Sequence, residues 1–386
     1  MKKLLSDKIT GIKPSGIRRF FDVANTMEDV ISLGVGEPDF DTPWFIRDEG
    51  IYSLEKGRTF YTSNAGLPEL KKEIAGYIQR RYKVTYDPKD EIIVTVGGSE
   101  GIDIAIRAMT NPGDEIIVPQ PSYVSYEPCV VMAGGTPVII ELEEKDGFKL
   151  TPEKLEEKIT DSTKLLVLPF PNNPTGSVMT YEELAGIAKI CIEKDIWVLS
   201  DEIYSELTYT KEGHASITQI PGMKERTILI NGFSKAYAMT GWRLGYACAP
   251  EVVMKQMLKI HQYCIMCAPT TSQYAAIAAL RNGDGEVAVM RESYNQRRRL
   301  LLKRLGDMGI PVFEPEGAFY IFPNISKFGM SSEEFALKLL EEKHVAVVPG
   351  SAFGDCGEGY IRISYAYSIK QLEQAMRRIK EFIQEK

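Results

Sequence analysis

The stretch that decides the fold is TILINGFSKAYAMTGWRLGY, residues 227–246. Its apolar start predicts a strand over residues 227–230, and Ser234 and Lys235 follow that strand. Arg243, framed by glycines, opens a second run that is typical of a strand. A lysine at a strand end, beside a hydroxyl and an arginine, suits an amine that forms an imine next to a bound phosphate. Pyridoxal phosphate carries both an aldehyde, which can form such an imine, and a phosphate. The alternative is that Lys235 is a solvated surface lysine.

The composition is ordinary for a globular protein. The chain has 386 residues, of which 44% are hydrophobic and 26% are charged, so it can build a large core and two domains. Its formal net charge of −7 argues against a general nucleic-acid surface. The densest basic cluster, residues 297–299, lies in a helical pattern and predicts a salt-bridged face or an interface edge.

Neither a membrane segment nor a metal site is expected. No run of about 20 apolar residues is present, and the N-terminus lacks the apolar segment of a signal peptide, so we expect a cytoplasmic protein without a membrane partner. Six cysteines are too few for a disulfide framework in a chain of this length. Cys264 and Cys267 form a lone C-x-x-C pair without suitably spaced histidines, so we expect reduced thiols rather than zinc ligands.

Apolar runs alternate with helical patterns through the first half of the chain. Strands are expected over residues 91–96, 115–118, 136–142, 164–169 and 196–200. This alternation is typical of a largely parallel sheet with helices on both faces. Such a sheet binds its ligands at the carboxyl ends of the strands.

Four polar loops follow predicted strands. They are residues 97–101, 172–176, 201–204 and 234–235. We expect them to converge at one edge of the sheet. The first, GGSEG, starts a helix directly after a strand, an arrangement that presents several N–H groups to an anion.

The pattern changes near residue 284. A long charged amphipathic helix is expected over residues 287–306. Shorter elements follow, with strands expected at 312–313, 318–322, 345–348 and 360–364 and helices at 332–343 and 368–385. Near the N-terminus a helix is expected over 15–26 and a strand over 30–35. The later elements predict a small α+β domain.

Taken together, the sequence resembles the class I/II aminotransferases of the pyridoxal-phosphate-dependent fold type I superfamily, which are similar to aspartate aminotransferase. The motifs that carry the resemblance are NPTG at 173–176, DEIY at 201–204, SKAYAMTGWR at 234–243 and YIRIS at 360–364. The resemblance implies an α/β fold with a large three-layer domain, residues 46–284, around a mostly parallel seven-stranded sheet. It also implies a smaller α+β domain built from both chain ends, residues 1–45 and 285–386.

The resemblance implies pyridoxal 5'-phosphate as the cofactor. Lys235 is expected to bond it as an imine and to act as general base and acid at the substrate α-carbon. Asp201 is expected to pair with the protonated ring nitrogen, which lets the ring accept electrons. Asn173 and Tyr204 are expected to donate hydrogen bonds to the phenolate oxygen of the cofactor. The expected catalytic residues are Lys235, Asp201 and Tyr204.

The remaining cofactor contacts are also implied by the resemblance. Tyr123 is expected to stack on the ring. The phosphate is expected to bind the backbone N–H groups of Gly98, Ser99 and Glu100 and the side chains of Ser99, Ser234 and Arg243. Tyr61 is expected to reach the phosphate from a partner subunit, which requires a homodimer.

The expected reaction moves the amino group of an L-amino acid to a 2-oxo acid by a ping-pong mechanism. Arg362 is expected to bind the substrate carboxylate as a planar fork, helped by Asn173 and the Gly36 backbone. In one aspartate-using branch of the family, lysine occupies the position of Ser99 and contacts the acidic side chain of the substrate. Serine at this position does not support a preference for acidic donors, so acidic, aromatic and alanine-like donors all remain open. 2-Oxoglutarate is the acceptor that the family suggests.

Two other functions are weighed against transamination. A pyridoxal-phosphate-dependent carbon–sulfur β-lyase has the same fold, but the intact NPTG at 173–176 favours transamination. A ligand-sensing domain of a transcription regulator requires a basic DNA-binding segment before the domain. Here the domain motifs begin close to Met1, so this function is not expected.

Overall fold

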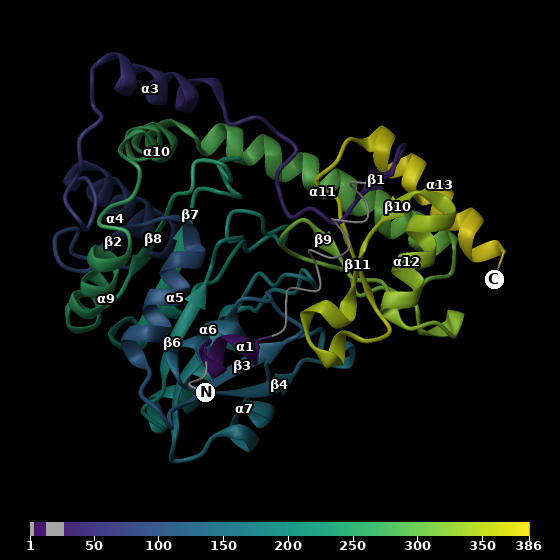
Figure 1. Ribbon diagram of the computed structural model, residues 1–386, viewed down its shortest axis with the longest axis horizontal. Helices are drawn as coiled ribbons and strands as arrows, with labels where there is room; N and C mark the ends of the chain where they lie inside the picture. The colour runs from purple at the N-terminus through teal and green to yellow at the C-terminus, as the bar shows by residue number, and fades with distance from the viewer. Residues whose placement is uncertain (1–3, 13–26, 386) are drawn as a thin grey trace.

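The computed structural model describes residues 4–12 and 27–385 of the chain (Figure 1). The helix expected over residues 15–26 lies outside these ranges. Within them, the strands and helices expected from residue 91 onward are largely confirmed, with bounds that differ by a few residues. Figure 1 shows that the long helix α11 (Asp284–Asp307) extends from the elements around the large sheet to the C-terminal elements.

A seven-stranded sheet forms the centre of the larger part of the molecule. Its strands are β2 (Ile92–Thr95), β3 (Glu115–Gln120), β4 (Thr136–Glu141), β5 (Thr163–Leu168), β6 (Trp197–Asp201), β7 (Thr227–Gly232) and β8 (Gly245–Cys248). They lie in the order β2-β8-β7-β6-β5-β3-β4. β8 is antiparallel to both of its neighbours and the other pairs are parallel. The predicted seven-stranded, mostly parallel sheet is therefore confirmed.

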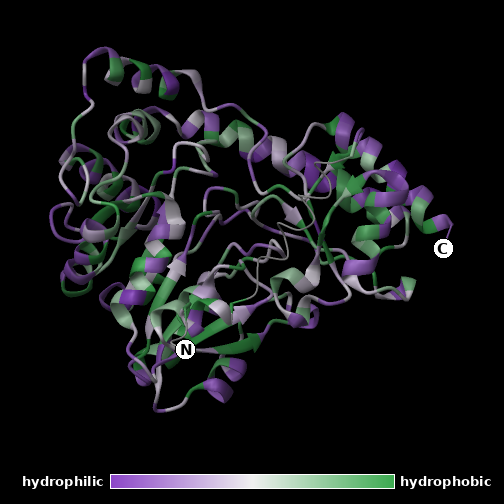
Figure 2. Cartoon of the chain, viewed as in Figure 1, coloured by the Kyte–Doolittle hydropathy of each residue, from purple (hydrophilic) through white to green (hydrophobic). Residues whose placement is uncertain are grey.

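Helices cover both faces of this sheet, as the alternation predicted. Ile116 and Val118 of β3 belong to a buried cluster on one face, whereas Ile117 belongs to a cluster on the other, because successive side chains of a strand point to opposite faces. The first face is covered by α5 (Gly97–Met109), α6 (Tyr126–Ala133) and α9 (Glu251–Cys264). The second is covered by α4 (Pro68–Tyr82), α7 (Pro152–Lys158), α8 (Tyr181–Glu193) and α10 (Thr270–Asn282). Figure 2 shows the strands between these helices as mainly hydrophobic.

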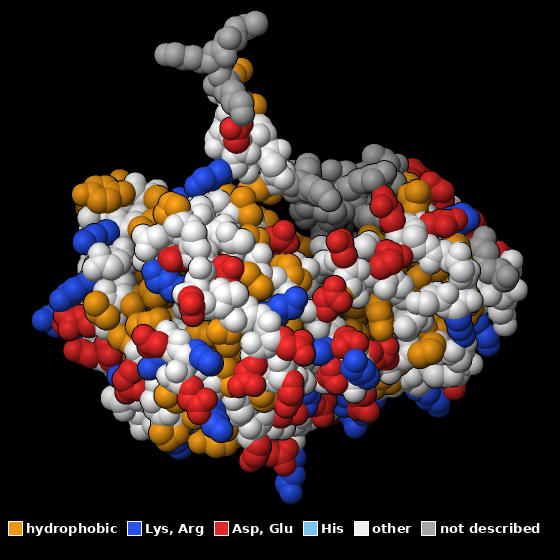
Figure 3. Space-filling view, turned by 90° about the horizontal axis from the view of Figure 1, so that it is seen from below, with side chains coloured by type: hydrophobic (Ala, Val, Ile, Leu, Met, Phe, Trp, Pro, Cys, Tyr) orange, Lys and Arg blue, Asp and Glu red, His pale blue; other side chains and the backbone are white. Residues whose placement is uncertain are grey.

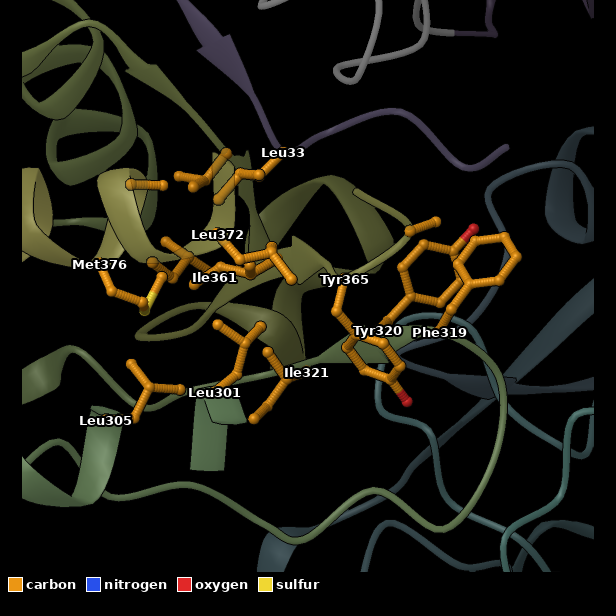
Figure 4. Close-up of a cluster of buried hydrophobic side chains, with 14 of the residues drawn as sticks. Leu33, Leu301, Leu305, Phe319, Tyr320, Ile321, Ile361, Tyr365, Leu372 and Met376 are labelled. Atoms are coloured by element: carbon orange, nitrogen blue, oxygen red, sulfur yellow. The ribbon is translucent and has the colours of Figure 1, made fainter. Parts of the chain in front are cut away.

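The C-terminal elements pack around a separate hydrophobic cluster (Figure 4). The strands of this part of the molecule are β9 (Tyr320–Ile321), β11 (Val348–Pro349) and β12 (Ile361–Ser364), which form an antiparallel sheet in the order β11-β12-β9. The helices that contribute to the cluster are α11, α12 (Ser332–Lys343) and α13 (Ile369–Gln384). β1 (Ile31–Ser32), from the start of the chain, pairs in parallel with β10 (Val345–Ala346). The division into domains at residues 46 and 284 stays a prediction.

Some predicted elements differ from the structure. The strand expected at residues 312–313 is a single bridge between Val312 and Pro323. The strand expected over 345–348 is divided into β10 and β11, which pair with different partners. Short apolar runs cannot reveal this division, because the partner strands come from distant parts of the chain. The structure also has α1 (Asp7–Thr10), α3 (Trp44–Glu55) and α10, which the sequence patterns did not predict.

The surface is of mixed charge. Figure 3 shows acidic and basic side chains interspersed on one face of the molecule. The basic cluster at 297–299 is salt-bridged as predicted, since Arg297, Arg298 and Arg299 pair with Asp39, Glu314 and Glu292 at 2.6, 2.8 and 3.2 Å. Within residues 4–12 and 27–385, no helix is long and apolar enough to cross a membrane, and no cluster of histidine, cysteine and acidic side chains is placed to hold a metal ion.

Candidate active site

A cavity of about 790 Å³ lies where the carboxyl ends of the parallel strands face the C-terminal elements. All four polar strand-end loops contribute to its wall. The residues singled out from the sequence that line it are Gly36, Gly98, Ser99, Tyr123, Asn173, Asp201, Tyr204, Ser234, Lys235, Arg243 and Arg362. Tyr61 and Glu100 are not among the lining residues. The structure therefore gathers most of the expected side chains around one space, while their roles stay predictions.

Lys235 follows β7, and its amine lies inside the cavity wall. Its Nζ donates a hydrogen bond to the Gly36 carbonyl oxygen at 2.5 Å and lies 5.8 Å from the ring centre of Tyr204. Burial lowers the pKa of this amine to about 8, with Glu37 opposing the shift and Arg362 and Arg243 adding to it. Because an uncharged amine is the nucleophilic form, this environment favours reaction of Lys235 with a carbonyl group.

Asp201 ends β6 and presents a buried carboxyl group to the cavity. It is 7% exposed. Its Oδ2 accepts a hydrogen bond from the Tyr126 hydroxyl at 2.7 Å, and its Oδ1 accepts one from the Ile203 N–H at 3.2 Å. Burial raises the pKa of Asp201, and these two hydrogen bonds counter part of the rise. A carboxylate has about four acceptor positions, and no cationic side chain among the described residues forms an ion pair with it, so it can still accept from a cationic donor.

The start of α5 and the start of β8 meet at the same end of the cavity. At Gly97, where φ is +77°, an added Cβ would lie 2.8 Å from Arg243 Nη2. At Gly245 an added Cβ would lie 2.6 Å from the Gly97 carbonyl carbon and 2.7 Å from the Gly98 nitrogen. These glycines therefore let a helix N-terminus and a guanidinium group approach each other, which is an arrangement that suits an anion.

The Glu100 side chain is directed elsewhere. Its Oε2 accepts a hydrogen bond from the Val96 N–H at 2.5 Å, and its Oε1 lies 2.6 Å from His261 Nδ1. His261 is fully buried in α9. Glu100 therefore ties the first turn of α5 to Val96, the residue between β2 and α5, and to the neighbouring helix α9, whereas the predicted contact of its N–H group with a phosphate is untested.

Arg362, in β12 of the C-terminal elements, is a buried cation in the cavity wall. It is 3% exposed, and burial lowers its pKa. Its Nη1 donates to Asn173 Oδ1 at 2.8 Å, and its Nη2 donates to the Gly34 carbonyl oxygen. No acidic side chain among the described residues pairs with it. A buried guanidinium without a counter-charge is well suited to a carboxylate ligand that takes two parallel hydrogen bonds.

Two tyrosines of the site were missed in the sequence. Tyr126 donates to Asp201, and the Tyr320 hydroxyl lies 2.8 Å from the Tyr204 hydroxyl. Tyr126 lies in α6, between the strands predicted over residues 115–118 and 136–142, and Tyr320 lies in the strand predicted over residues 318–322. In both stretches an aromatic residue is typical of core, so no local signal distinguished them.

Tyr61 lies on the surface of this chain. It is 80% exposed, next to Phe60, which is 81% exposed. Tyr263 is 85% exposed. The prediction that Tyr61 reaches the cavity of a second chain is not tested by one chain, but Tyr61 does not line the cavity of its own chain.

Comparisons with known proteins agree over nearly the whole chain. A family model described as aminotransferase class I and II matches residues 28–379. The chain is 54% identical to a putative aminotransferase, YugH, of Bacillus subtilis and 46% identical to an aspartate aminotransferase of Pyrococcus abyssi, with 99% of each chain covered in both cases. The solved structure of an aromatic aminotransferase from Pyrococcus horikoshii is similar with a TM-score of 0.91 and 44% identity, covering 95% of this chain and 99% of that one.

Proposed function

The chain belongs to the class I and II aminotransferase family and is an aminotransferase, and from this premise we propose that it uses pyridoxal 5'-phosphate to move an amino group from an L-amino acid to a 2-oxo acid. The observation that carries the proposal is that Lys235, Asp201 and Arg362 line one cavity. They supply an amine of lowered pKa, a buried carboxyl group and a buried guanidinium that pairs with no acidic side chain among the described residues.

The residues present fit this cofactor. The buried carboxyl group of Asp201 accepts from Tyr126 and Ile203 and is unpaired by any described cation, so a protonated ring nitrogen is a suitable partner. The glycines at 97 and 245 let the start of α5, the start of β8 and the Arg243 guanidinium approach one another closely, which suits a phosphate. Tyr123 supplies an aromatic ring in the same wall.

Each side chain then has a task that follows from its chemistry. Bound pyridoxal phosphate supplies an aldehyde that takes the amino group and a ring that accepts the electrons freed at the substrate α-carbon. Lys235 would bond the aldehyde, and its amine, once freed by an incoming substrate, would serve as general base and acid toward the proton of that carbon. The Asp201 carboxyl group would hold the proton on the ring nitrogen, Asn173 and Tyr204 would donate to the ring oxygen, and Tyr123 would stack on the ring face.

The phosphate contacts are proposed at the start of α5. Backbone N–H groups of residues 98–100 and the side chains of Ser99, Ser234 and Arg243 would hold its oxygens. We propose that Tyr61 completes this set from a partner subunit in a homodimer. Its 80% exposure, beside Phe60 and outside its own cavity, supports that arrangement, because large exposed apolar groups that lie together are typical of an interface.

The donor and the acceptor are proposed to use Arg362 in turn. The guanidinium, set by Asn173 and the Gly34 carbonyl oxygen, binds the carboxylate that both an amino acid and a 2-oxo acid carry. A single carboxylate position used twice supports a ping-pong order, in which the first product leaves before the acceptor enters. Acidic, aromatic and alanine-like donors remain candidates, with 2-oxoglutarate as the proposed acceptor.

The test is an absorbance titration of the purified protein against the common amino acids. We expect the absorbance band of the bound aldehyde cofactor to be lost with genuine donors alone and to return when 2-oxoglutarate is added. Absence of a cofactor band would contradict the proposal. Release of pyruvate and ammonia from cysteine or cystathionine, without an oxo-acid acceptor, would indicate a carbon–sulfur β-lyase instead.

A further inference from the structure

The hydroxyl groups of Tyr204 and Tyr320 form a buried pair between the two parts of the molecule. They lie 2.8 Å apart, and the two residues are 6% and 1% exposed. Tyr204 follows β6 of the large sheet, whereas Tyr320 lies in β9 of the C-terminal elements. Figure 4 shows Tyr320 and Phe319 beside each other in the hydrophobic cluster of those elements.

Tyr320 has two further contacts in the cavity wall. The Arg362 guanidinium lies 4.3 Å from its ring centre, which is a favourable distance for a cation over an aromatic face. At Gly36 an added Cβ would lie 2.5 Å from the Tyr320 hydroxyl oxygen, so the hydroxyl lies directly against the turn whose carbonyl oxygen accepts from Lys235. Tyr320 thus contacts the proposed carboxylate site through its ring and the proposed cofactor site through its hydroxyl.

The direction of the hydrogen bond between the two phenols decides what Tyr204 can do. If Tyr204 donated to Tyr320, it would have no hydrogen left for a ligand in the cavity, because a phenol has one. Burial raises the pKa of Tyr320, but the charge of Arg362 over its ring acts in the opposite direction. For Tyr204, burial and the Tyr320 neighbour raise the pKa well above its usual value, and Arg362, which also lowers this pKa, counters only a smaller part of the rise. The more acidic phenol is the better donor, which favours donation from Tyr320 to Tyr204.

We propose that Tyr320 is a positioning residue that donates its hydroxyl hydrogen to Tyr204 and so leaves the Tyr204 hydrogen to point into the cavity, toward the ring oxygen of the cofactor. This inference rests on the proposed function. A phenol that accepts a hydrogen bond is a stronger donor in its own right, because bonds in a chain polarise one another. The ring of Tyr320 has a separate task, which is to support Arg362.

The test is the pH titration of the absorbance band of the holoenzyme in Tyr320→Phe. We expect its midpoint to rise by about half a pH unit to one unit, since a weaker donor at the ring oxygen lets the cofactor keep its proton to higher pH. Tyr204→Phe should move the midpoint in the same direction. Tyr320→Phe added to Tyr204→Phe should cause no further shift, because the hydroxyl through which it acts is gone.

The matched control is Tyr365→Phe. Tyr365 is fully buried in the same cluster and donates to the Ala318 carbonyl oxygen at 3.2 Å, but it does not line the cavity, so its loss should leave the midpoint unchanged. KM for the amino donor should stay within about twofold in Tyr320→Phe, which keeps the ring under Arg362. Tyr320→Leu also lacks the hydroxyl and gives the same midpoint shift, with a raised KM, should the phenylalanine variant not retain the cofactor.

Two results would overturn the inference. The first is a folded Tyr320→Phe holoenzyme whose midpoint equals that of the unaltered protein. The second is a shift of full size when Tyr320→Phe is added to Tyr204→Phe, which would mean that Tyr320 does not act through Tyr204. Failure of the proposed function is distinguishable from both, since the unaltered protein would then have no cofactor band to titrate.

Discussion

At the scale of single residues, Arg362 offers a planar fork to a two-oxygen ligand. Lysine cannot reproduce two parallel N–H bonds. We therefore expect Arg362→Lys to raise KM for the amino donor by about 10- to 100-fold, which corresponds to the loss of one hydrogen bond to a charged group, with a smaller effect on kcat. Steady-state kinetics of the purified variant measure both constants.

The control for this substitution is Arg298→Lys. Arg298 is also largely buried, but it pairs with Glu314 and the Pro315 carbonyl oxygen and does not line the cavity. Its substitution should leave KM unchanged. An unchanged KM in Arg362→Lys would remove Arg362 from the carboxylate site.

The lowered pKa of Lys235 predicts a pH-dependent stability of the cofactor-free protein. Burial lowers this pKa from 10.5 to about 8, so between these values the unfolded chain holds a proton that the folded chain lacks. The contribution of Lys235 to the free energy of unfolding therefore rises with pH across that window. Below pH 8 the folded protein must hold a buried charge, and the full cost of that charge lowers its stability. Relative to the unaltered protein, cofactor-free Lys235→Met should be more stable at pH 7, with a difference that shrinks toward pH 10.

Urea denaturation at several pH values measures this difference, and the comparison with Lys235→Met cancels the contribution of other titrating groups. A difference that stays constant from pH 7 to pH 10 would contradict a lowered pKa at Lys235.

Single residues were predictable where they stand in polar loops after strands. Asn173, Asp201 and Lys235 are polar residues at the ends of apolar runs, and the structure brings all three to one cavity. Tyr126 and Tyr320 were not predictable in this way. Each is an aromatic residue inside a regular element, and its contact with Asp201 or Tyr204 is formed between segments far apart in the sequence.

At the scale of elements, the start of α5 depends on how closely β8 approaches it. An added Cβ at Gly245 would meet backbone atoms of Gly97 and Gly98 at 2.6 and 2.7 Å, and backbone cannot move aside as a flexible side chain can. We expect Gly245→Ala to weaken pyridoxal phosphate binding by tenfold or more, because displacement of this turn misplaces the groups that hold an anion. Binding of the cofactor to the cofactor-free protein measures the effect.

Gly241→Ala is the matched control, since an added Cβ there has no described atom within 4 Å. It lies in the same loop as Arg243 and lines the same cavity. Equal losses of affinity in both variants would show that the loop, rather than the approach of β8 to α5, is responsible.

Elements were predictable where hydrophobic periodicity is strong. The helix expected over 332–343 has the bounds of α12. α3 was missed because it buries only Ile46, Gly50 and Ser53, which leaves no apolar stripe in the sequence. α10 was missed for the opposite reason, since its alanine-rich sequence is buried on several sides and lacks a clear polar face.

At the scale of the whole molecule, the proposed homodimer can be tested by combining two defective chains. If Tyr61 serves the partner's site, a hybrid of Lys235→Ala and Tyr61→Ala chains contains one complete site, because the Lys235→Ala chain supplies its Tyr61 to the chain that keeps Lys235. Co-expression should therefore restore activity above that of either variant alone. The mass in solution should be that of two chains.

Activity of the co-expressed chains that does not exceed the average of the two variants would contradict a shared site. A chain that remains monomeric at micromolar concentration would contradict the homodimer itself.

The fold class of the whole molecule was predictable from the sequence, but the order of the strands in its sheets was not. Alternating strands and helices indicated a largely parallel sheet with two covered faces, which is what the structure has. The insertion of the antiparallel β8 between β2 and β7 and the pairing of β1 with β10 join distant segments. Local patterns do not encode such pairings, and for the sheet only the family resemblance supplied the number of strands.

Whether Lys235 holds an aldehyde cofactor is tested most directly by borohydride reduction of the purified protein, followed by mass mapping of the modified residue. Reduction fixes an aldehyde cofactor to the amine that bonds it. If Lys235 bonds the cofactor, a single pyridoxyl label will be found on Lys235, in the peptide that contains residues 232–243. A label on another lysine, or a protein that takes up none when supplied with pyridoxal phosphate, would contradict it.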